Sequence, residues 1–483
     1  MKRPNILFMM PDQLRADFVG CYGAEFARTP RLDELAKSAT MFERCLSPNP
    51  ICVPARASMM TGQSSLESGI LVNDRWLRPD RRSCGIDTWP ELLSEAGYAT
   101  YGVGKMHFTP WDASEGFQTR IIAEDKRHID LKDDYHEHLT AIGEQKRHGR
   151  DMAGYHDNGG ACISPLSPKD YVDAWCADQA IDLLKTHDPT QPFAMMIGFP
   201  SPHCPYDPPA EIAALFDPQE MPASFPATHA SETLRPWLVQ NMKAPWADID
   251  YSEFSTEQIA KVRAHYVALI YMLDRAVGRI LDTLVETGVD DDTLIVFSSD
   301  HGDFVGDFGL VCKNFFMDGA VRVPMILRVP GRAAARRTDT VTLSDVYPTF
   351  LAAAGITLRE GVTFRNLMTP PPATPRAICG ATHRGFMIER DRMKLARYVG
   401  GLVTLYDMRA DPQEQISLAE NSAHFDLRQE LEARLTDWQV GESLAAHNDK
   451  RTPPSGLGLS EEDRFSRGWQ RVYPHNPNAS GNP

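Results

Sequence analysis

The sequence predicts an α/β protein with a large, mostly parallel sheet that helices cover on both faces. Short apolar runs alternate along the chain with segments in which apolar residues recur at the helical period. The 483 residues suffice for one large domain and a smaller one, and 42% hydrophobic with 24% charged residues is ordinary for a folded chain. We therefore expect an extensive buried core and no global disorder.

The candidate strands are five short apolar runs, at 5–10, 98–103, 193–199, 293–298 and 323–329. Three helices have signals of their own. One begins at Pro30, which suits a first helical position, and another spans roughly 170–186. The longest starts at Ser255, whose spacing to Gln258 is that of a capping box, and ends near Gly288.

Composition divides the chain into a main domain at 1–368, a small C-terminal subdomain at 376–445 and a tail at 446–483. The proline-rich stretch 369–375 is the linker. Alternating apolar residues after the linker predict a small antiparallel sheet, followed by a helix around 424–440. The tail is rich in proline, glycine and charge, which predicts either disorder or an arm that orders against another subunit.

Residues 110–169 interrupt the alternation with a polar, weakly periodic segment. A loop this long inside a compact domain is usually a lid or a binding insertion. We interpret its histidines as solvated side chains, and a metal pair formed by His136 and His138 is the alternative. Substrate specificity is expected to come from this insertion, from 204–254 and from the C-terminal subdomain.

Charge and cysteine usage exclude several classes of partner. With 50 basic and 65 acidic residues the net charge is −15, which argues against nucleic acid and anionic membranes. No apolar run reaches the ~18 residues of a membrane span, and the N-terminal run ends too early, at Pro11, for a signal peptide. Nine cysteines, an odd number without a C-x-x-C pair, favour the cytoplasm, where thiols stay reduced.

Polar residues follow four of the predicted strands at the point where each strand ends. Ligands of open α/β sheets bind beyond the carboxyl ends of the strands. Asp12, Asp300 and His301 are suited to a divalent cation, and carboxylate oxygen favours Ca²⁺, with Mg²⁺ and Mn²⁺ as alternatives. Cationic groups and histidines would surround an anion beside the metal, as phosphoryl or sulfuryl transfer needs. These are Lys105, His107, His203 and Lys313.

Cys52 stands between two prolines, and the residues alone leave its role open. It could be a buried structural thiol. A cysteine-phosphatase nucleophile needs a longer backbone-amide loop than the four-residue step from Cys52 to Arg56 provides. A metal thiolate lacks a second cysteine nearby, and a hard cation does not prefer sulfur. None of the three explains Pro54 and the position of Arg56.

The stretch CVPARASMMTG at 52–62 resembles the first signature of the type I sulfatase family, whose cysteine is oxidised to formylglycine. GYATYGVGKMH at 97–107 is similar to the second signature. SSDHGDFVGDFG at 298–309, with the lysine and the VRVPMILRVPG that follow, is similar to the third conserved region, and 405–421 to the C-terminal one. The matches occur in chain order from residue 4 to about 421. The resemblance implies an alkaline phosphatase-like α/β fold with a small C-terminal sheet.

The resemblance also implies a mechanism. Hydrated formylglycine at position 52 would present two hydroxyls, one of which attacks sulfur. His203 with Lys313 would bind the ester and protonate the leaving alcohol. His107 would deprotonate the second hydroxyl, so that the aldehyde re-forms and sulfate leaves.

The remaining site residues follow from the same resemblance. Arg56 would hold the formylglycine, Lys105 would bridge it and the sulfate, and Asn73 matches a position near the substrate. Gln13 departs from the aspartate that many sulfatases have there. An Asp-Gln pair also occurs in choline-sulfatase-like proteins and in phosphonate monoester hydrolases of the superfamily. The implied metal ligands are Asp12, Gln13, Cys52, Asp300 and His301.

We therefore expect a sulfatase that acts on a small aryl or alkyl sulfate ester. The alternative is a phosphonate monoester hydrolase or phosphodiesterase with the same site, and the remote alternative is a non-catalytic binding protein. The Lys105 and His107 pair, which the phosphonate hydrolases lack, favours sulfate. The expected partners are the ester, a formylglycine-generating enzyme that acts on the unfolded chain and, as one interpretation of the tail, further copies of the chain.

Overall fold

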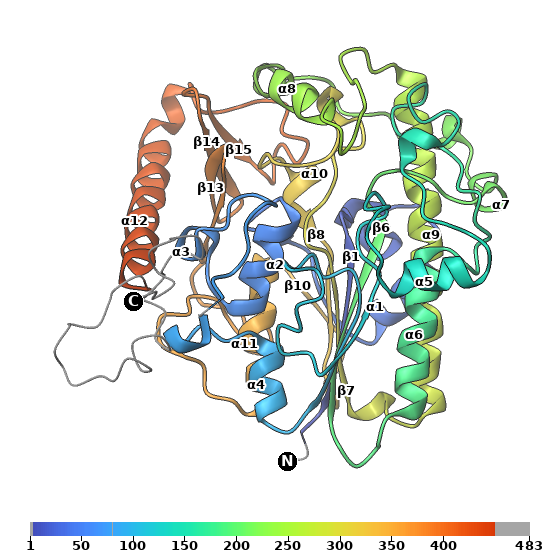
Figure 1. Ribbon diagram of the computed structural model, residues 1–483. Helices are drawn as coiled ribbons and strands as arrows, with labels where there is room; N and C mark the ends of the chain where they lie inside the picture. Colours follow the sequence, from blue (N-terminus) through green and yellow to red (C-terminus); the bar gives the residue numbers. More distant parts are fainter. Residues whose placement is uncertain (1–2, 80, 450–483) are drawn as a thin grey trace, which may run out of the picture.

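A sheet of eight strands forms the centre of the computed structural model, which describes residues 3–79 and 81–449 (Figure 1). The strands β7, β1, β6, β4 and β5 are parallel, whereas β9 runs antiparallel to both of its neighbours. The predicted mostly parallel sheet is thus confirmed. In spatial order the strands are β10 (Ala335–Arg337), β2 (Thr40–Phe42), β9 (Met325–Arg328), β7 (Thr293–Ser298), β1 (Asn5–Asp12), β6 (Phe193–Pro202), β4 (Ala99–Gly104) and β5 (Thr119–Ile122).

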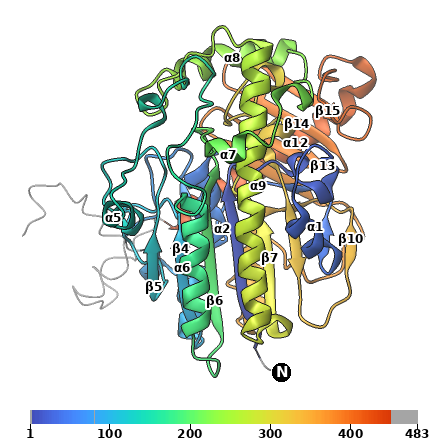
Figure 2. The same ribbon diagram turned by 90° about the vertical axis from the view of Figure 1, so that its right-hand side faces the viewer.

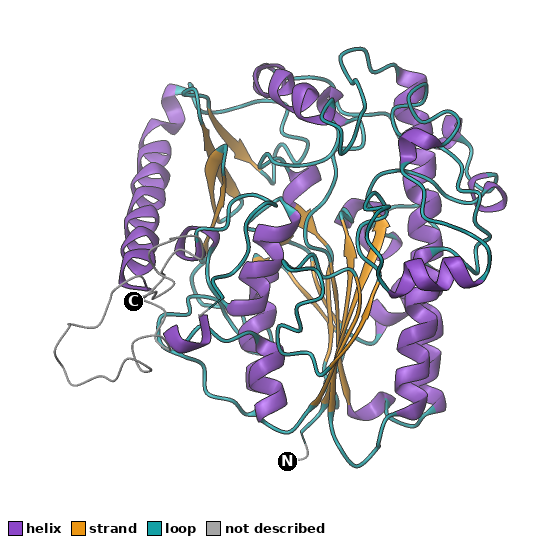
Figure 3. Cartoon of the chain, in the orientation of Figure 1, coloured by secondary structure: helices purple, strands orange, loops and turns teal. Residues whose placement is uncertain are grey.

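Helices cover both faces of this sheet, as the three-layer view shows (Figure 3). One face carries α1 (Pro30–Lys37), α6 (Val172–Thr186) and α9 (Thr256–Glu286), with α6 and α9 lying along the sheet in Figure 2. The opposite face carries α2 (Cys52–Thr61), α4 (Trp89–Glu95) and α11 (Val346–Ala354).

Strand β1 shows why two layers of helices are needed. Its side chains alternate between the faces, so Leu7 and Met9 join one buried apolar cluster while Ile6, Phe8 and Met10 join the other. All five are fully buried. A parallel strand that is apolar on both faces has to be covered on both.

The main elements match the sequence prediction within a few residues. The capping box of Ser255 and Gln258 is present and starts α9. The strand predicted at 193–199 continues to Pro202, and the one predicted at 323–329 is shorter, because only Met325–Arg328 pair in the sheet. Short strands were missed: besides β2, β5 and β10, a second sheet consists of β11 (Val341–Thr342), β3 (Cys45–Leu46) and β8 (Arg322–Val323). Segments of two to four residues are too short to show an apolar period.

The insertion at 110–169 is more structured than predicted. Its β5 is the edge strand of the main sheet, and α5 (Asp134–Ala141) follows, capped by Asp133. His136 and His138 lie on α5, and the candidate metal group found in the described part of the chain includes neither. Residues two apart on a helix do not face each other, so the positions of His136 and His138 on α5 do not favour the alternative of a metal pair.

The C-terminal region forms a separate antiparallel sheet, as predicted. Its strands are β12 (Ala377–Thr382), β13 (Gly385–Arg390), β14 (Met393–Tyr398) and β15 (Val403–Asp407). The helix α12 (Phe425–Asp449) packs on this sheet through Leu431 and Leu435 and is longer than the predicted 424–440. The predicted tail lies outside the described residues from 450 onwards. Across the described ranges, no helix combines the length and the apolar character that crossing a membrane requires.

Candidate active site

The ends of four neighbouring strands bring the predicted polar residues together. Asp12 is the last residue of β1, Lys105 follows β4, His203 follows β6, and Asp300 comes two residues after β7. These strands are adjacent in the order β7-β1-β6-β4, so their carboxyl ends form one edge. The structure thus places these residues at the edge where a ligand site was expected.

Helix α2 explains the sequence around Cys52. Cys52 is its first residue, and all ten of its residues are buried. Pro54 lies in the first turn, where a missing N–H costs nothing. Gly62 ends the helix with φ of 67°, and a Cβ there would lie 2.6 Å from the Tyr347 ring. The motif therefore forms a buried helix that begins with the cysteine.

Arg56 lies one helical turn after Cys52 and therefore on the same side of α2. Its Nη2 donates to Asp12 Oδ2 and its Nε to Asp300 Oδ2, both at 3.0 Å. Its Nη1 donates to the Lys105 carbonyl at 2.7 Å. The guanidinium thus fixes both carboxylates through one oxygen each.

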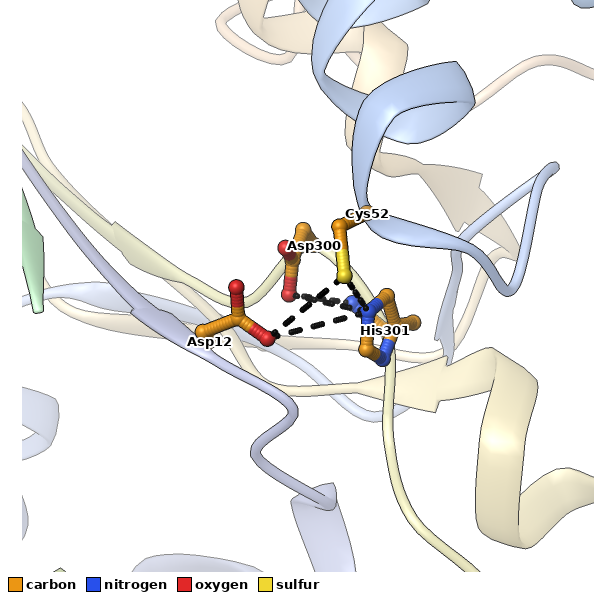
Figure 4. Close-up of side chains that lie close together, drawn as sticks. All are labelled: Asp12, Cys52, Asp300 and His301. Carbon is orange, nitrogen blue, oxygen red and sulfur yellow. Dashed lines mark hydrogen bonds and ion pairs between the residues drawn. The ribbon is translucent and has the colours of Figure 1, made fainter. Parts of the chain in front are cut away.

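Four side chains converge beside α2 (Figure 4). Ligand atoms of Asp12, Cys52, Asp300 and His301 lie within 4.8 Å of one another, and all four residues are buried. The Cys52 Sγ is 3.1 Å from His301 Nε2 and 3.9 Å from Asp12 Oδ1. Two carboxylates and an imidazole are suitable donors for one divalent cation.

The ring orientation of His301 supports its use as a ligand. Its Nδ1 lies 3.0 Å from the Gly302 carbonyl oxygen, to which it can only donate. The proton is therefore assigned to Nδ1, and the lone pair of Nε2 points into the cluster.

Gln13 connects the cluster to Lys313. Its backbone N–H donates to Asp300 Oδ1 at 3.0 Å. Its side-chain oxygen accepts from Lys313 Nζ at 2.5 Å, and its amide nitrogen donates to Asp303. Its role as a metal ligand stays a prediction.

Lys313 and His203 form a pair on the same side of the site. Lys313 Nζ donates to His203 Nε2 at 2.7 Å, which requires the lone pair of the histidine at Nε2. His203 Nδ1 in turn lies 2.8 Å from the Cys204 carbonyl oxygen and donates to it. Both side chains are buried, and one proton, donated by Lys313 Nζ, lies between the two nitrogens.

Lys105 is fully buried between two carboxylates. Its Nζ lies 2.9 Å from Asp12 Oδ2 and 2.7 Å from Asp125 Oδ2. Burial alone would lower the pKa of Lys105, but Asp12 and Asp125 raise it above its usual value. Lys105 therefore carries a positive charge inside the site.

The electrostatic environment of position 52 favours an anion. Burial raises the pKa of the Cys52 thiol, but Lys313 and His301, with hydrogen bonds to His107 and His203, lower it well below its ordinary value. Cys52 also stands at the N-terminus of α2, where the helix dipole favours negative charge.

His107 lies on a left-handed backbone, with φ of 62°. Its backbone N–H donates to both carboxylate oxygens of Glu124, at 3.1 and 3.2 Å. Its Nδ1 is buried and finds no hydrogen-bond partner among the described side chains and backbone. The ring is therefore held beside Cys52 with one nitrogen available to a ligand.

Asn73 serves α2 directly. Its Oδ1 accepts a hydrogen bond from the Val53 N–H at 3.1 Å, which satisfies an N–H in the first turn of the helix. The side chain is exposed and lines the cleft above Cys52. A contact between Asn73 and the substrate stays a prediction.

Sequence reasoning missed Asp125 and Arg127. Arg127 Nη2 lies 2.7 Å from Asp125 Oδ2 and 3.5 Å from His203 Nε2, and its guanidinium stacks on Trp246 at 5.0 Å. Both residues follow β5 and reach the same sheet edge as the predicted ones. They were missed because 119–122 was not identified as a strand, although the run TRII followed by EDKR carries the strand-end signal.

A cleft of about 770 Å³ opens beside Cys52, within the usual size of small-molecule sites. The three regions expected to set specificity all contribute to its walls, beside residues of 51–74, 107–109 and 312–314. The insertion supplies residues such as Trp111 and Arg127, the 204–254 segment supplies Trp246, and the turn between β12 and β13 supplies His383.

A buried group of side chains suited to a divalent cation, beside a helix N-terminus that favours an anion, is the arrangement found in metal-dependent hydrolases of anionic esters. Comparison with known proteins makes this specific. The model of the family described as "Sulfatase" matches residues 4–356, so the chain belongs to the sulfatase family and is a sulfuric ester hydrolase.

Similar proteins span nearly the whole chain. It is 27% identical to an arylsulfatase of Clostridium perfringens, over 92% of this chain and 97% of that protein. It is 29% identical to a choline-sulfatase of Rhizobium meliloti, over 87% of this chain and 83% of that protein. The crystal structure of the phosphonate monoester hydrolase of Agrobacterium radiobacter superposes with a TM-score of 0.79 at 23% identity, over 91% and 96% of the two chains. The alkaline phosphatase-like fold is thereby confirmed.

Proposed function

We propose that the chain hydrolyses a small aryl or alkyl sulfate monoester to an alcohol and sulfate, with formylglycine made from Cys52 as nucleophile and one bound divalent cation. The observation that carries this is the double enclosure of the Cys52 side chain. Ligand atoms of Asp12, Asp300 and His301 lie within 4.8 Å of one another and of its Sγ, and the side chains of Lys313, His107 and His203 also interact with it. The Cys52 Sγ stands where the oxygens of the modified residue would be.

Asp12, Asp300 and His301 would hold the cation, with Gln13 and residue 52 beside them. When bound, the cation supplies positive charge that activates a hydroxyl and steadies the transferring group. The oxygen-rich donor set favours Ca²⁺, with Mn²⁺ and Mg²⁺ as alternatives. The test is to remove the metal with a chelator and to compare the recovery of activity with each of the three ions.

His203 and Lys313 are placed to handle the leaving group. Their nitrogens are 2.7 Å apart, so a proton is held beside Cys52. We assign the pair to binding the ester oxygen and to protonating the alcohol as it leaves.

His107 and the two buried cations complete the cycle. His107, whose ring is hydrogen-bonded to the side chain at position 52, takes the proton of the second hydroxyl there, so that sulfate is released as the aldehyde re-forms. Arg56 fixes the carboxylates and the start of α2. Lys105 supplies fixed positive charge toward the sulfate.

Mass spectrometry of the peptide that contains Cys52 tests the modification. In protein made with a formylglycine-generating enzyme, this peptide should be lighter by the change from thiol to aldehyde. The same protein should hydrolyse p-nitrophenyl sulfate. Full activity in material that carries only thiol at position 52 would exclude the proposal, and native protein that carries only thiol and has no activity would favour the non-catalytic alternative.

The second candidate function is phosphonate monoester or phosphodiester hydrolysis, and the Asp12–Gln13 pair is the observation that favours it. A matched p-nitrophenyl panel of sulfate, phosphate, phosphonate and phosphodiester decides by the order of kcat/KM. Lys105 and His107 both lie near position 52, so we expect the sulfate ester to have the highest kcat/KM of the four substrates.

Cytoplasmic location and self-association are also proposals. The eight cysteines whose side chains the structure describes are free thiols, which fits a reducing compartment. Fractionation of the producing cells tests the compartment. Light scattering of the full chain, compared with a chain truncated after Asp449, tests whether the tail assembles subunits.

A further inference from the structure

Two cysteines adjoin the two residues assigned to the leaving group. Cys204 follows His203, and Cys312 precedes Lys313. Both thiols are buried, the side chains of the flanking His203 and Lys313 meet at 2.7 Å, and a side-chain hydrogen bond joins the two sulfurs. The fold thus brings two reduced sulfurs together from segments that are far apart in the sequence.

Their surroundings make one thiol more reactive than the other. The hydrogen bond with Cys312 lowers the pKa of Cys204 well below its usual value despite burial, and His203 and Arg127 act in the same direction. The Cys204 Sγ is 3.6 Å from His203 Nδ1. The same hydrogen bond raises the pKa of Cys312. A thiolate beside a neutral thiol is the arrangement from which disulfides form.

Two properties distinguish Cys204 and Cys312 from the other buried cysteines: their position beside the cleft and the pKa of Cys204. Cys312 lines the cleft and Cys204 does not, so a small oxidant would enter from the cleft at Cys312, whose side chain is hydrogen-bonded to that of Cys204. Burial instead raises the pKa of Cys45, Cys162 and Cys176, which favours unreactive thiols.

We propose that Cys204 and Cys312 form a reversible disulfide that inactivates the enzyme when a peroxide is present. The Cys204 thiolate attacks one peroxide oxygen, the O–O bond breaks, and the other oxygen leaves as water after taking up a proton. The Cys312 sulfur then attacks the sulfenic acid on Cys204, the S–S bond forms, and the hydroxyl leaves as a second water with the proton of the thiol. Two thiols lose two electrons and two protons, and one hydrogen peroxide becomes two waters.

The expected loss of activity rests on the proposed function of His203 and Lys313. An S–S bond of about 2.05 Å is much shorter than any contact between two thiols. Its formation therefore pulls together the two segments whose side chains meet at 2.7 Å in the reduced protein. Because a shift of about 1 Å in catalytic groups can cost about 100-fold, we expect kcat/KM to fall at least about tenfold.

The experiment uses enzyme whose Cys52 is shown to be converted, with Cys204→Ala and Cys312→Ala as test variants. Cys21→Ala is the matched control, because Cys21 is more exposed and does not line the cleft. Each protein is treated with hydrogen peroxide, alkylated, digested without reduction and mapped by mass spectrometry. Activity is measured before treatment, after it, and after addition of dithiothreitol.

We expect a linked Cys204–Cys312 peptide in the wild type and in the control, together with a loss of activity that dithiothreitol reverses. Both test variants should keep their activity under peroxide. Free, alkylated Cys204 and Cys312 after treatment would overturn the proposal, as would sulfinic acid at either position or equal inactivation of the test variants. The peptide map does not depend on turnover, so it tests the disulfide even if the proposed function fails.

Discussion

Two of the clusters of buried charge in the described part of the chain use their charges differently. The interface cluster joins the main domain to the C-terminal sheet and consists of Arg44, Asp318, Glu389, Lys394 and Glu414. The catalytic cluster lies at the sheet edge and consists of Asp12, Cys52, Arg56, Lys105, Asp300 and His301. Both are buried.

The interface cluster is closed. Arg44 binds both Asp318 oxygens, at 2.6 and 2.9 Å, and also binds Glu389. Lys394 bridges Asp318 and Glu414. Burial raises the pKa of Glu414 to about 7, so part of its negative charge is lost at neutral pH. Charge is matched inside the cluster.

The catalytic cluster is open on one side. Asp12 and Asp300 each give one oxygen to Arg56, while Asp12 Oδ1 faces Cys52 and His301 Nε2 across 3.8 to 3.9 Å. These contacts are long and weak, and the atoms are close enough together to bind one cation. Both clusters are buried and charged, so these two properties do not distinguish them. The functional cluster differs because some of its ligand atoms are not fully used in pairing within the cluster.

The largest effect should come from Cys52→Ala, which removes the side chain proposed as the nucleophile from the open side of the catalytic cluster. Turnover of sulfate esters should fall by roughly 10⁴-fold or more. Because the side chain forms no ion pair, the free energy of unfolding should change by less than about 1.5 kcal/mol. Steady-state kinetics and urea unfolding measure the two quantities. Residual turnover near the wild-type level would show that the open side does not carry the chemistry.

Arg44→Met should produce the opposite result in the closed cluster. It leaves Glu389 without its main partner, so the free energy of unfolding should fall by about 3 to 5 kcal/mol, while kcat of the folded enzyme stays within about twofold. Arg336→Met is the matched control, since Arg336 pairs with Glu43 at the surface and should cost less than about 1 kcal/mol. A large fall in kcat with stability unchanged would reverse the distinction between the clusters.

The sequence predicted more of the open cluster than of the closed one. Asp12, Lys105, His203 and Asp300 each stand at the end of a recognisable strand, so local pattern sufficed to group them. Arg44 and Glu389 lie 345 residues apart; Arg44 follows the three-residue β2 and Glu389 lies inside β13, so nothing local links them. Asp125 was missed for a different reason, because the four-residue β5 that precedes it shows no detectable period.

The fold was predicted to a similar degree. Long apolar elements such as α9 and β7 were found with nearly their observed bounds. The short strands β3, β8 and β11 were not, because pairing with distant strands and not their own sequence holds them extended. The helix that begins at Cys52 was also missed, since Pro54 there resembles a loop signal until its place in the first turn is known.

A smaller effect is expected from His265, which is buried as a neutral base and belongs to neither charged cluster. His265 lies on α9, with Nδ1 3.0 Å from the Tyr206 carbonyl oxygen, and burial lowers its pKa from 6.5 to about 4. Between these pH values the unfolded chain binds the proton and the folded one does not, so stability is complete above pH 6.5 and is lost as pH falls toward 4. The contribution lost by pH 5 is about 2 kcal/mol. His265→Gln should remove this part of the acid slope in urea unfolding, whereas the exposed His229→Gln should leave it unchanged. An unaltered slope in His265→Gln would assign acid sensitivity to other groups.

The smallest effect should come from Asp125→Asn, since Asp125 combines features of both clusters. It is buried and paired like the closed cluster, yet its partners Lys105 and Arg127 reach the active site. Burial would raise the pKa of Asp125, but Arg127 and Lys105 lower it well below its usual range, so the carboxylate is charged. The amide should loosen Lys105 and reduce kcat/KM by about 10-fold, with most of the change in kcat because Lys105 is assigned to the reacting sulfate.

Two control variants sharpen this prediction. Asp125→Glu should restore part of kcat. Asp130 is an exposed carboxylate on the cleft, and Asp130→Asn should change kcat/KM less than twofold, about 0.4 kcal/mol. A loss of stability with kcat preserved would instead place Asp125 with the closed cluster.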